Sequence, residues 1–203
     1  MRLRIDVSGP EAVVERVRSA ARDLAPDARV EARQGDELRV AIDGVMLEVG
    51  DEPELPEWLI EAGIVRALRP RHILFLCVAN SARSQMAEGI ARSLAPPGVR
   101  VSSAGSSPTK VRPQAIQVLR EIGIDIASHV AKHVSTIDAQ SVEAVVTLCG
   151  EEECPLFLGK ALRVHWGLPD PAAVGGSAEE QLGAFRGVRD ELVRRLQVML
   201  ARQ

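Results

Sequence analysis

The sequence is poor in aromatic residues and carries no large excess of charge of either sign. It contains no tyrosine, three phenylalanines and two tryptophans among 203 residues, and its formal net charge is -3. The absence of an overall basic field argues against nucleic-acid binding. No apolar run is long enough to cross a bilayer, and residues 1–7 alternate like a strand and lack the apolar core of a signal peptide. We therefore expect a cytoplasmic protein that binds neither nucleic acid nor a membrane.

Cysteine is also scarce. The chain has three cysteines, an odd number, which in a reducing compartment is more typical of catalytic or redox-active thiols than of a structural disulfide framework. Hydrophobic residues make up 46% of the chain, which is enough for one sizeable core or two small ones. The cysteines are therefore the first candidates for chemistry.

The most informative segment joins a buried strand to a helix through a short loop that contains a cysteine. The apolar run 73–76 predicts the strand, Cys77 ends it, and a helix opens near Ser84. Loop amides and a helix N-terminus attract an anion, and the same environment lowers the pKa of a thiol from its usual value near ~8.5. Arg83 adds a planar fork that suits a tetrahedral oxyanion. The expected oxyanion-binding loop consists of Val78, Ala79, Asn80, Ser81, Ala82, Arg83 and Ser84. The alternative is a buried strand cysteine beside a surface arginine.

Residues 1–68 are predicted to form a small α+β domain in the order β-α-β-β-α. Strands are expected at 3–7 and near 29–32, with an amphipathic helix over 10–24 between them. Asp43-Gly44 between two strand-like runs predicts a two-residue hairpin turn, and a helix from near Pro56 closes the domain. The segment contains no catalytic constellation. We expect a packing, dimerising or partner-docking domain, and the sequence leaves open whether the chain is a homodimer.

Residues 72–203 alternate between strands and helices, which predicts an α/β domain with a four-stranded parallel open sheet flanked by helices. The strands are expected at 72–77, 100–103, 144–148 and 162–165. The helices are expected at about 84–94 and 113–122, with a shorter one after Thr136 and a long one after Ser177. The last is the clearest, because Ser177 and Glu180 form a capping-box pattern before an apolar stripe.

Two further cysteines and an aspartate belong at the carboxyl ends of the predicted strands, where parallel open sheets bind their ligands. Cys149 ends a predicted strand, and Cys154 follows it through a glycine and three glutamates. A disulfide between them requires a bent segment, because five residues of straight helix rise roughly 7.5 Å. The alternative is a buried Cys149 and an incidental surface thiol at Cys154. Asp170 follows the last predicted strand and could protonate a departing oxygen, although Asp-Pro is also an ordinary turn sequence.

Five motifs in order give the second domain a family resemblance. The motifs are 77–84, 101–105, 145–149, 165–172 and 185–191. Together they resemble the thioredoxin-coupled arsenate reductases, which are relatives of the low-molecular-weight protein tyrosine phosphatases. The resemblance covers about residues 72–201 and says nothing of residues 1–68.

The resemblance implies a role for each candidate residue. Cys77 would attack arsenate, Arg83 and the loop amides would hold the oxyanion, and Asp170 would act as general acid. Cys149 would attack the sulfur of Cys77 and expel arsenite, and Cys154 would then bridge to Cys149, leaving a disulfide that thioredoxin reduces. Thiolate attack on a sulfur with a stabilised leaving group fits this order.

The chain departs from some members of the family at a cation site. Some members place a carboxylate near the position of Lys132, and that carboxylate helps to bind potassium beside Asn80, Glu88 and Ser103. An ammonium group could replace the ion, so no metal and no cofactor is expected, although a solvated surface lysine is an equally good account.

Two other functions use the same loop. One is a phosphatase that hydrolyses a phosphomonoester through a Cys77 adduct, which needs neither of the other cysteines. The lack of tyrosine weakens it, because the related phosphatases use tyrosines on the acid loop to grip an aromatic substrate. The other is an oxyanion or redox sensor whose first domain docks a partner.

Overall fold

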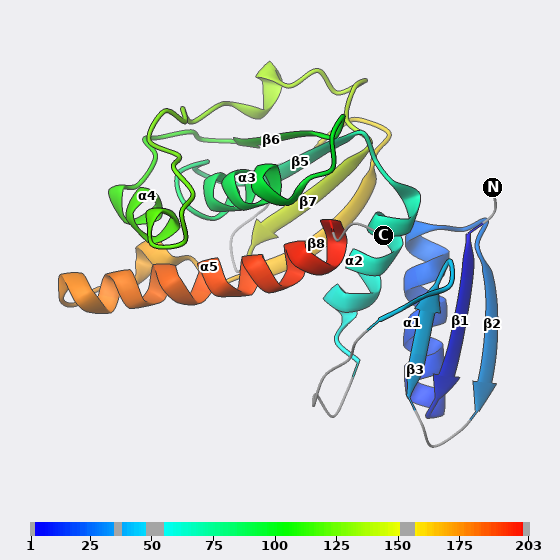
Figure 1. The fold of residues 1–203 in the computed structure, drawn as a ribbon. Helices are drawn as coiled ribbons and strands as arrows, with labels where there is room; N and C mark the ends of the chain where they lie inside the picture. Colours follow the sequence, from blue (N-terminus) through cyan, green and yellow to red (C-terminus); the bar gives the residue numbers. More distant parts are fainter. Residues whose placement is uncertain (1–2, 35–37, 48–54, 151–156, 201–203) are drawn as a thin grey trace. The chain divides into compact units, whose positions relative to one another are not determined.

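Two units, Met1–Arg69 and Pro70–Gln203, make up the chain, and the computed structural model describes residues 3–34, 38–47, 55–150 and 157–200 (Figure 1). The first unit contains the sheet of β1 (Arg4–Gly9), β2 (Arg29–Gln34), β3 (Arg39–Ile42) and β4 (Val45–Met46), with helices α1 (Glu11–Leu24) and α2 (Glu57–Leu68). The strand order is β2-β1-β3-β4, with β2 parallel and β3 antiparallel to β1. The β1-α1-β2 connection is the crossover that parallel strands require.

One face of this first sheet is apolar and the other is polar. In β1, Ile5 and Val7 are buried while Arg4 is exposed, as the period-two alternation of a strand dictates. The hairpin between β3 and β4 turns at Asp43 and Gly44, both with positive φ (50° and 79°), which is the two-residue turn that Asp-Gly predicts. Residues 48–49 of the expected second hairpin strand lie outside the described residues.

The second unit contains the predicted four-stranded parallel sheet. Its strands are β5 (His72–Cys77), β6 (Arg100–Gly105), β7 (Ala144–Cys149) and β8 (Leu162–Leu168), in the order β6-β5-β7-β8 with every pairing parallel. All six residues of β5 are buried, which explains the unbroken apolar run that follows His72 in this inner strand of the sheet. This topology brings the carboxyl ends of β5, β7 and β8 to one edge.

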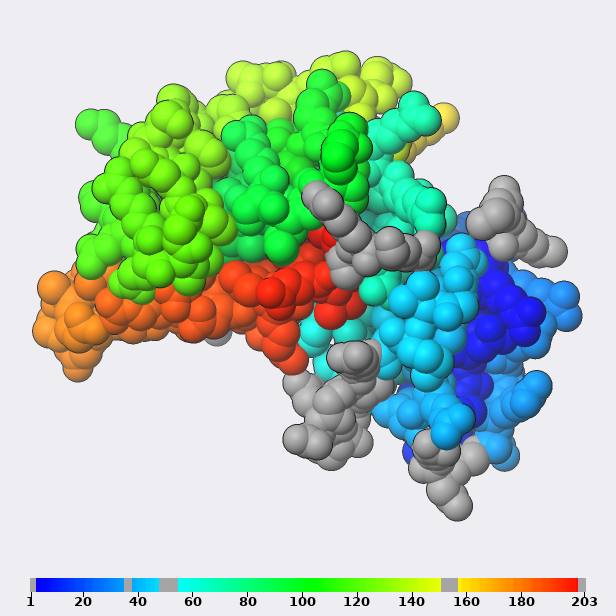
Figure 2. Space-filling view, viewed as in Figure 1, coloured from blue at the N-terminus to red at the C-terminus, as the bar shows by residue number. Residues whose placement is uncertain are grey.

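Three helices of this unit, α3 (Arg83–Leu94), α4 (Pro113–Arg120) and α5 (Ala178–Leu200), pack against one another (Figures 1 and 2). The capping box is confirmed, because the Ser177 amide donates to Glu180 Oε2 (2.7 Å) and the Glu180 amide donates to Ser177 Oγ (3.3 Å). Arg189 of α5 is buried and donates to the Val118 carbonyl (3.0 Å) of α4. Among the described residues, no helix combines the length and the apolar character needed to span a membrane.

The short helix expected after Thr136 is wrong. A 3-10 turn at Val134–Thr136 is followed by a turn rather than a helix. Asp138 explains the difference, because its Oδ1 accepts from the Gln140 amide (3.1 Å) and its carbonyl accepts from the Ser141 amide (3.1 Å). Such local bonds compete with helix formation. Side chains of the same segment, including Ile137, pack against Leu74 and Leu76 on the sheet.

Packing of α5 predicts a large difference between two leucines of the second unit. Leu192 on α5 has no exposed surface, whereas Leu158 is 84% exposed. We expect Leu192→Ala to lower the free energy of unfolding by about 2–5 kcal/mol, and Leu158→Ala to change it by less than about 0.5 kcal/mol. Urea unfolding followed by Trp166 fluorescence in a Trp58→Phe background measures this unit alone. Equal effects of the two substitutions would contradict the packing described here.

Candidate active site

The loop between β5 and α3 encloses a small pocket with the cysteine at its base. Cys77 is the last residue of β5 and is buried, and α3 begins at Arg83. The pocket has a volume of about 180 Å³ and is lined by Cys77, Val78, Ala79, Ser81, Ala82, Arg83 and Asp170. The structure therefore brings together the cysteine, the loop, the arginine and the acid that the sequence singles out.

The loop carbonyls are held from behind by the segment after β6. The amides of residues 107, 109 and 112 donate to the carbonyls of Val78 (3.0 Å), Ala79 (3.0 Å) and Ser81 (2.9 Å). In a planar trans peptide the N–H points opposite to the C=O. The amides of residues 79, 80 and 82, which follow these carbonyls, therefore point away from the segment after β6. The N-cap of α3, Ala82, makes no side-chain cap hydrogen bond. Loop and first-turn amides are thus available to an anion, which the helix dipole also favours.

Gly105 allows the loop to pass close to the end of β6. A Cβ atom at this position would lie 2.8 Å from the Asn80 nitrogen and 2.8 Å from the Cys77 carbonyl oxygen. Both atoms belong to backbone, so a side chain could be accommodated only by moving the loop. Glycine is therefore required by the close approach of two backbone segments.

A chain of hydrogen bonds runs from the Cys77 sulfur into the loop. Ser84 Oγ lies 2.9 Å from Cys77 Sγ and accepts from Asn80 Nδ2 (2.8 Å). Because Asn80 is the donor in that bond, the Ser84 hydroxyl keeps its own proton for donation to the sulfur. Asn80 Nδ2 also donates to Ser103 Oγ (2.8 Å), which ties the loop to β6.

Asn80 holds the loop in its conformation through its backbone angles and its side-chain hydrogen bonds. It is fully buried and has φ of 44°, a left-handed conformation that asparagine tolerates better than most residues. Its Oδ1 accepts from the Lys132 amide (2.7 Å) and from Gln85 Nε2 (3.0 Å). Every polar atom of this side chain therefore has a partner.

Gln85 and His129 extend this network, and sequence reasoning assigned neither of them a role. Gln85 Nε2 donates to the carbonyls of Asn80 (3.2 Å) and Val130 (3.2 Å), and its Oε1 lies 3.0 Å from His129 Nδ1. Burial lowers the pKa of His129, with Arg92 and Lys132 adding to the shift and Glu88 and Asp125 opposing it. A glutamine within a helix and an isolated histidine carry no sequence pattern that would reveal this contact.

Glu88 and Lys132 form an ion pair beside the loop. Lys132 Nζ lies 3.3 Å from Glu88 Oε2, which also accepts from Ser103 Oγ, and Glu88 Oε1 pairs with Arg92 (2.5 Å). Glu88 is buried, so the two cationic side chains compensate its charge. The Lys132 ammonium also donates to the Val130 carbonyl (3.3 Å), so the Glu88 carboxylate is already paired with two cationic side chains and offers no uncompensated charge to an additional monovalent cation.

Arg83 connects the loop with the ends of β7 and β8. Its buried guanidinium donates from Nη1 to the carbonyls of Leu168 (3.0 Å) and Leu148 (3.5 Å). Its Nη2 lies 3.7 Å from Asp170 Oδ1. The Asp170 side chain is 35% exposed, and its Oδ1 accepts from the Ala172 amide (3.2 Å). Asp170 therefore forms the Asp-Pro turn and also lies where the proposed acid is expected. The turn itself places the carboxyl group at the pocket.

Cys149 lies at the same edge of the sheet as Cys77. Leu76 of β5 pairs with Thr147 of β7, so Cys149 is one residue beyond the position level with Cys77 on the adjacent strand. Both cysteines are buried thiols, and a register irregularity between Thr147 and Cys149 marks the end of β7. Cys154 lies outside the described residues.

Comparison with known proteins places the second unit in a family. Residues 72–203 match the family described as low molecular weight phosphotyrosine protein phosphatase. The chain belongs to this family. The match begins at the first residue of β5 and leaves the first unit outside it.

Its relatives include curated arsenate reductases. The arsenate reductase of Halalkalibacterium halodurans is 42% identical over 126 residues, which are 61% of this chain and 91% of the relative. That of Bacillus subtilis is 40% identical over the same shares. A solved structure described as an arsenate reductase in the phosphate binding state superposes with a TM-score of 0.57 at 32% identity, covering 64% of this chain and 97% of the other.

The His129 environment predicts a pH dependence of stability. Because burial holds the pKa of His129 below its usual value near ~6.5, protonation favours the unfolded chain. Its contribution is fully present above about pH 6.5 and is lost as the pH falls through the lower native pKa. His129→Asn keeps a donor for Gln85 Oε1 and does not titrate, so we expect a shallower loss of thermal stability between about pH 7 and 5.

Burial also lowers the pKa of His72, which is present both in the unmodified protein and in His129→Asn. Its contribution to the pH dependence therefore cancels when the two proteins are compared. If the Tm values of the unmodified protein and of His129→Asn fall by the same amount between about pH 7 and 5, His129 has no role in the pH dependence.

Proposed function

We propose that the second unit reduces arsenate to arsenite by a thiol relay of Cys77, Cys149 and Cys154, and that thioredoxin recycles the enzyme. The observation that carries the proposal is the position of Cys149. A second thiol at the end of the strand adjacent to the oxyanion pocket supplies electrons that hydrolysis does not need. The relatives named arsenate reductase support the same substrate.

The first step forms a bond between sulfur and arsenic. The Cys77 thiolate attacks the arsenic atom of arsenate, one arsenic–oxygen bond breaks, and Asp170 delivers a proton to the oxygen that leaves as water. Arg83 and the loop amides hold the remaining oxygens, which keep their negative charge. The position of Asp170 on the pocket wall, with Arg83 beside it, supports this assignment.

The second step transfers two electrons to arsenic. The Cys149 thiolate attacks Cys77 Sγ, the sulfur–arsenic bond breaks, and its electron pair remains on arsenic, which leaves as arsenite. The product on the enzyme is a disulfide between Cys77 and Cys149. Because both thiols are buried in the reduced form, this step requires the end of β7 to move toward Cys77.

The third step moves the disulfide to a place where a protein reductant reaches it. Cys154 attacks Cys149, and Cys77 departs as a thiolate beside the Ser84 hydroxyl. A thioredoxin dithiol then reduces the disulfide between Cys149 and Cys154 and becomes a disulfide itself. Such a cycle requires free thiols, and we place it in the cytoplasm, where thiols are kept reduced.

Replacing the second cysteine separates reduction from hydrolysis. We expect Cys149→Ser to reduce arsenite release, measured with thioredoxin, its reductase and NADPH, to the rate without enzyme. Hydrolysis of a small phosphomonoester, which uses only the Cys77 pocket, should remain unchanged. Phosphomonoester hydrolysis without any arsenite release by the unmodified protein would overturn the proposal and favour the phosphatase.

The order of the relay is tested by a variant that stops before its last step. After a single turnover with arsenate, thiol trapping and mass spectrometry should find Cys149 bridged to Cys154 in the unmodified protein. The same experiment on Cys154→Ser should find Cys77 bridged to Cys149. A Cys77–Cys154 bridge in Cys149→Ser, with arsenite released, would contradict the proposed order.

Lys132 is proposed to do permanently what a bound potassium ion does in other members of the family. We expect Lys132→Met to lower the free energy of unfolding by about 1–3 kcal/mol, because it removes a partner from the buried Glu88 carboxylate. Potassium should restore part of the loss in the variant and have no specific effect on the unmodified protein. Lys160→Met, at an exposed position, is the matched control. Equal stabilisation of all three proteins by potassium would exclude this role.

A further inference from the structure

The first unit has an open strand edge that the proposed chemistry does not use. In the sheet order β2-β1-β3-β4, β2 is an edge strand of six residues, whereas the other edge strand, β4, has two. Among the described residues, no strand pairs with the outer side of β2. A long edge strand offers its backbone groups to another strand.

The backbone groups available at this edge follow from the pairing with β1. The Arg29 amide donates to the carbonyl of Leu3 (2.8 Å), the residue before β1. Because N–H and C=O groups change sides with each residue of a strand, those of Val30 and Ala32 point outward. The Ala28 carbonyl points outward as well, while its amide is bonded to the Ala25 carbonyl (2.8 Å).

The charges along this edge are complementary to those of a second, antiparallel copy of the same segment. Residues 27–33 read Asp-Ala-Arg-Val-Glu-Ala-Arg, and Val30 is their centre. Antiparallel pairing of two copies about Val30 places Arg29 opposite Glu31 within the strands and brings Arg33 to the turn that contains Asp27. Val30 then faces Val30, and each Ala28 faces an Ala32. The two charged positions next to the axis therefore meet the opposite sign, which stabilises cross-strand pairs.

We propose that β2 pairs with β2 of a second copy of this chain across a two-fold axis at Val30, joining two four-stranded sheets into one of eight strands. The two Val30 residues exchange two backbone hydrogen bonds, and each Ala32 amide donates to the Ala28 carbonyl of the other copy. The interaction is isologous, as in most soluble homodimers. It is independent of the function proposed for the second unit.

Neighbouring registers are disfavoured by the same side chains. A shift by two residues in one direction places Arg29 opposite Arg33 and Glu31 opposite Glu31. The shift in the other direction places Arg29 opposite Arg29 and Asp27 opposite Glu31. Both registers use the same outward backbone groups, so only the charges distinguish them. Like charges directly opposite each other are destabilising, so the register about Val30 is selected.

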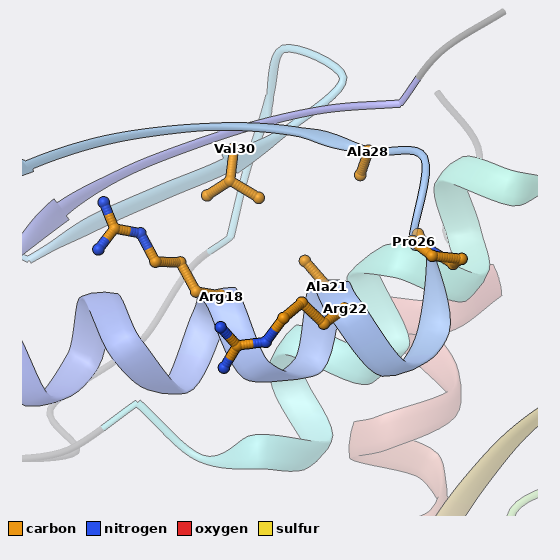
Figure 3. Close-up of a pocket in the computed structure, with 7 residues that line it drawn as sticks. Arg18, Ala21, Arg22, Pro26, Ala28 and Val30 are labelled. Atoms are coloured by element: carbon orange, nitrogen blue, oxygen red, sulfur yellow. The ribbon is translucent and has the colours of Figure 1, made fainter.

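The helix side of the edge supports the same arrangement. Figure 3 shows Ala28 and Val30 pointing from β2 toward α1 over a cavity of about 140 Å³, with Arg18 and Arg22 of α1 alongside. On α1, exposed residues of one stripe are acidic in the first half of the helix, at 11 and 15, and basic in the second half, at 18 and 22. A two-fold axis makes α1 of the second copy run in the opposite direction. The acidic first half of α1 in one copy is therefore on the same side as the basic second half of α1 in the other copy.

The test uses the full-length protein and charge reversal at the two central positions. Because the interface is small, we expect a weak dimer whose dissociation appears in sedimentation equilibrium over about a hundredfold range of micromolar concentrations. Glu31→Arg and Arg29→Glu each place like charges opposite each other, and we expect each to weaken dimerisation by at least about tenfold. Mixing these two variants should restore a dimer, because each supplies the charge that the other needs.

Three further proteins make the result specific. The double variant Arg29→Glu/Glu31→Arg is again self-complementary and should dimerise like the unmodified chain. Arg39→Glu, on β3 and away from the edge, is the control that should not change dimerisation. Val30→Pro removes an amide that points away from β1 and that no described strand of the unit uses, so this variant should fold and remain monomeric.

Circular dichroism of each variant verifies that the fold is intact. An unmodified protein that stays monomeric over the whole range would overturn the proposal. A dimer that survives both single charge reversals and Val30→Pro would also overturn it, because another surface must then form the contact. Neither outcome bears on arsenate reduction, which is measured separately.

Discussion

The active-site loop depends on one buried asparagine held in a left-handed conformation. Asn80 has φ of 44° and no exposed surface, and its amide group is bonded to α3, to β6 and to the backbone of residue 132. A strained residue persists only where its surroundings over-determine it, and here three separate elements do so. Since the same Ser84 hydroxyl accepts from Asn80 and contacts the Cys77 sulfur, the bonds that fix the backbone also orient the group next to the nucleophile.

The parallel sheet explains why residues distant in sequence share this pocket. Adjacent strands β5, β7 and β8 end on the same side of the sheet, so Cys77 and Asp170 line one pocket without any long loop to carry them, and Cys149 ends the strand between theirs. Arg83 then joins the three ends, since its guanidinium reaches the carbonyls at the ends of β7 and β8 and approaches Asp170. An arginine that lines the pocket and also links the strand ends is costly to replace, because its loss affects the charge and the geometry of the pocket together.

Strong local patterns allowed most of this architecture to be predicted. The strand of Cys77 is apolar from residue 73 onward, Ser177 and Glu180 cap α5, and Asp43-Gly44 turns a hairpin, because in each case neighbouring residues decide the conformation. The helix expected after Thr136 failed because Asp138 bonds to its own turn, an alternative that apolar spacing does not reveal. The contact of Gln85 with His129 joins positions 44 residues apart, and no periodic pattern encodes it. The sequence alone allows a solvated Lys132, and its contact with the buried Glu88 carboxylate depends on the packing of two segments 44 residues apart.

Lys132 joins three parts of the structure around the loop. Its amide donates to Asn80, its carbonyl accepts from Gly105 (2.9 Å), and its ammonium group pairs with Glu88, so a single residue connects the loop, the end of β6 and α3. A bound ion contributes stability that depends on its concentration, whereas a covalently attached charge is always present. Ordering a long side chain costs rotamer entropy, and this cost opposes the stabilisation that the pairing with Glu88 provides. The geometry of the loop is therefore set by the chain alone, and the anion that enters the pocket meets donors already in place, which is the condition under which oriented amides and a guanidinium stabilise a developing charge most effectively.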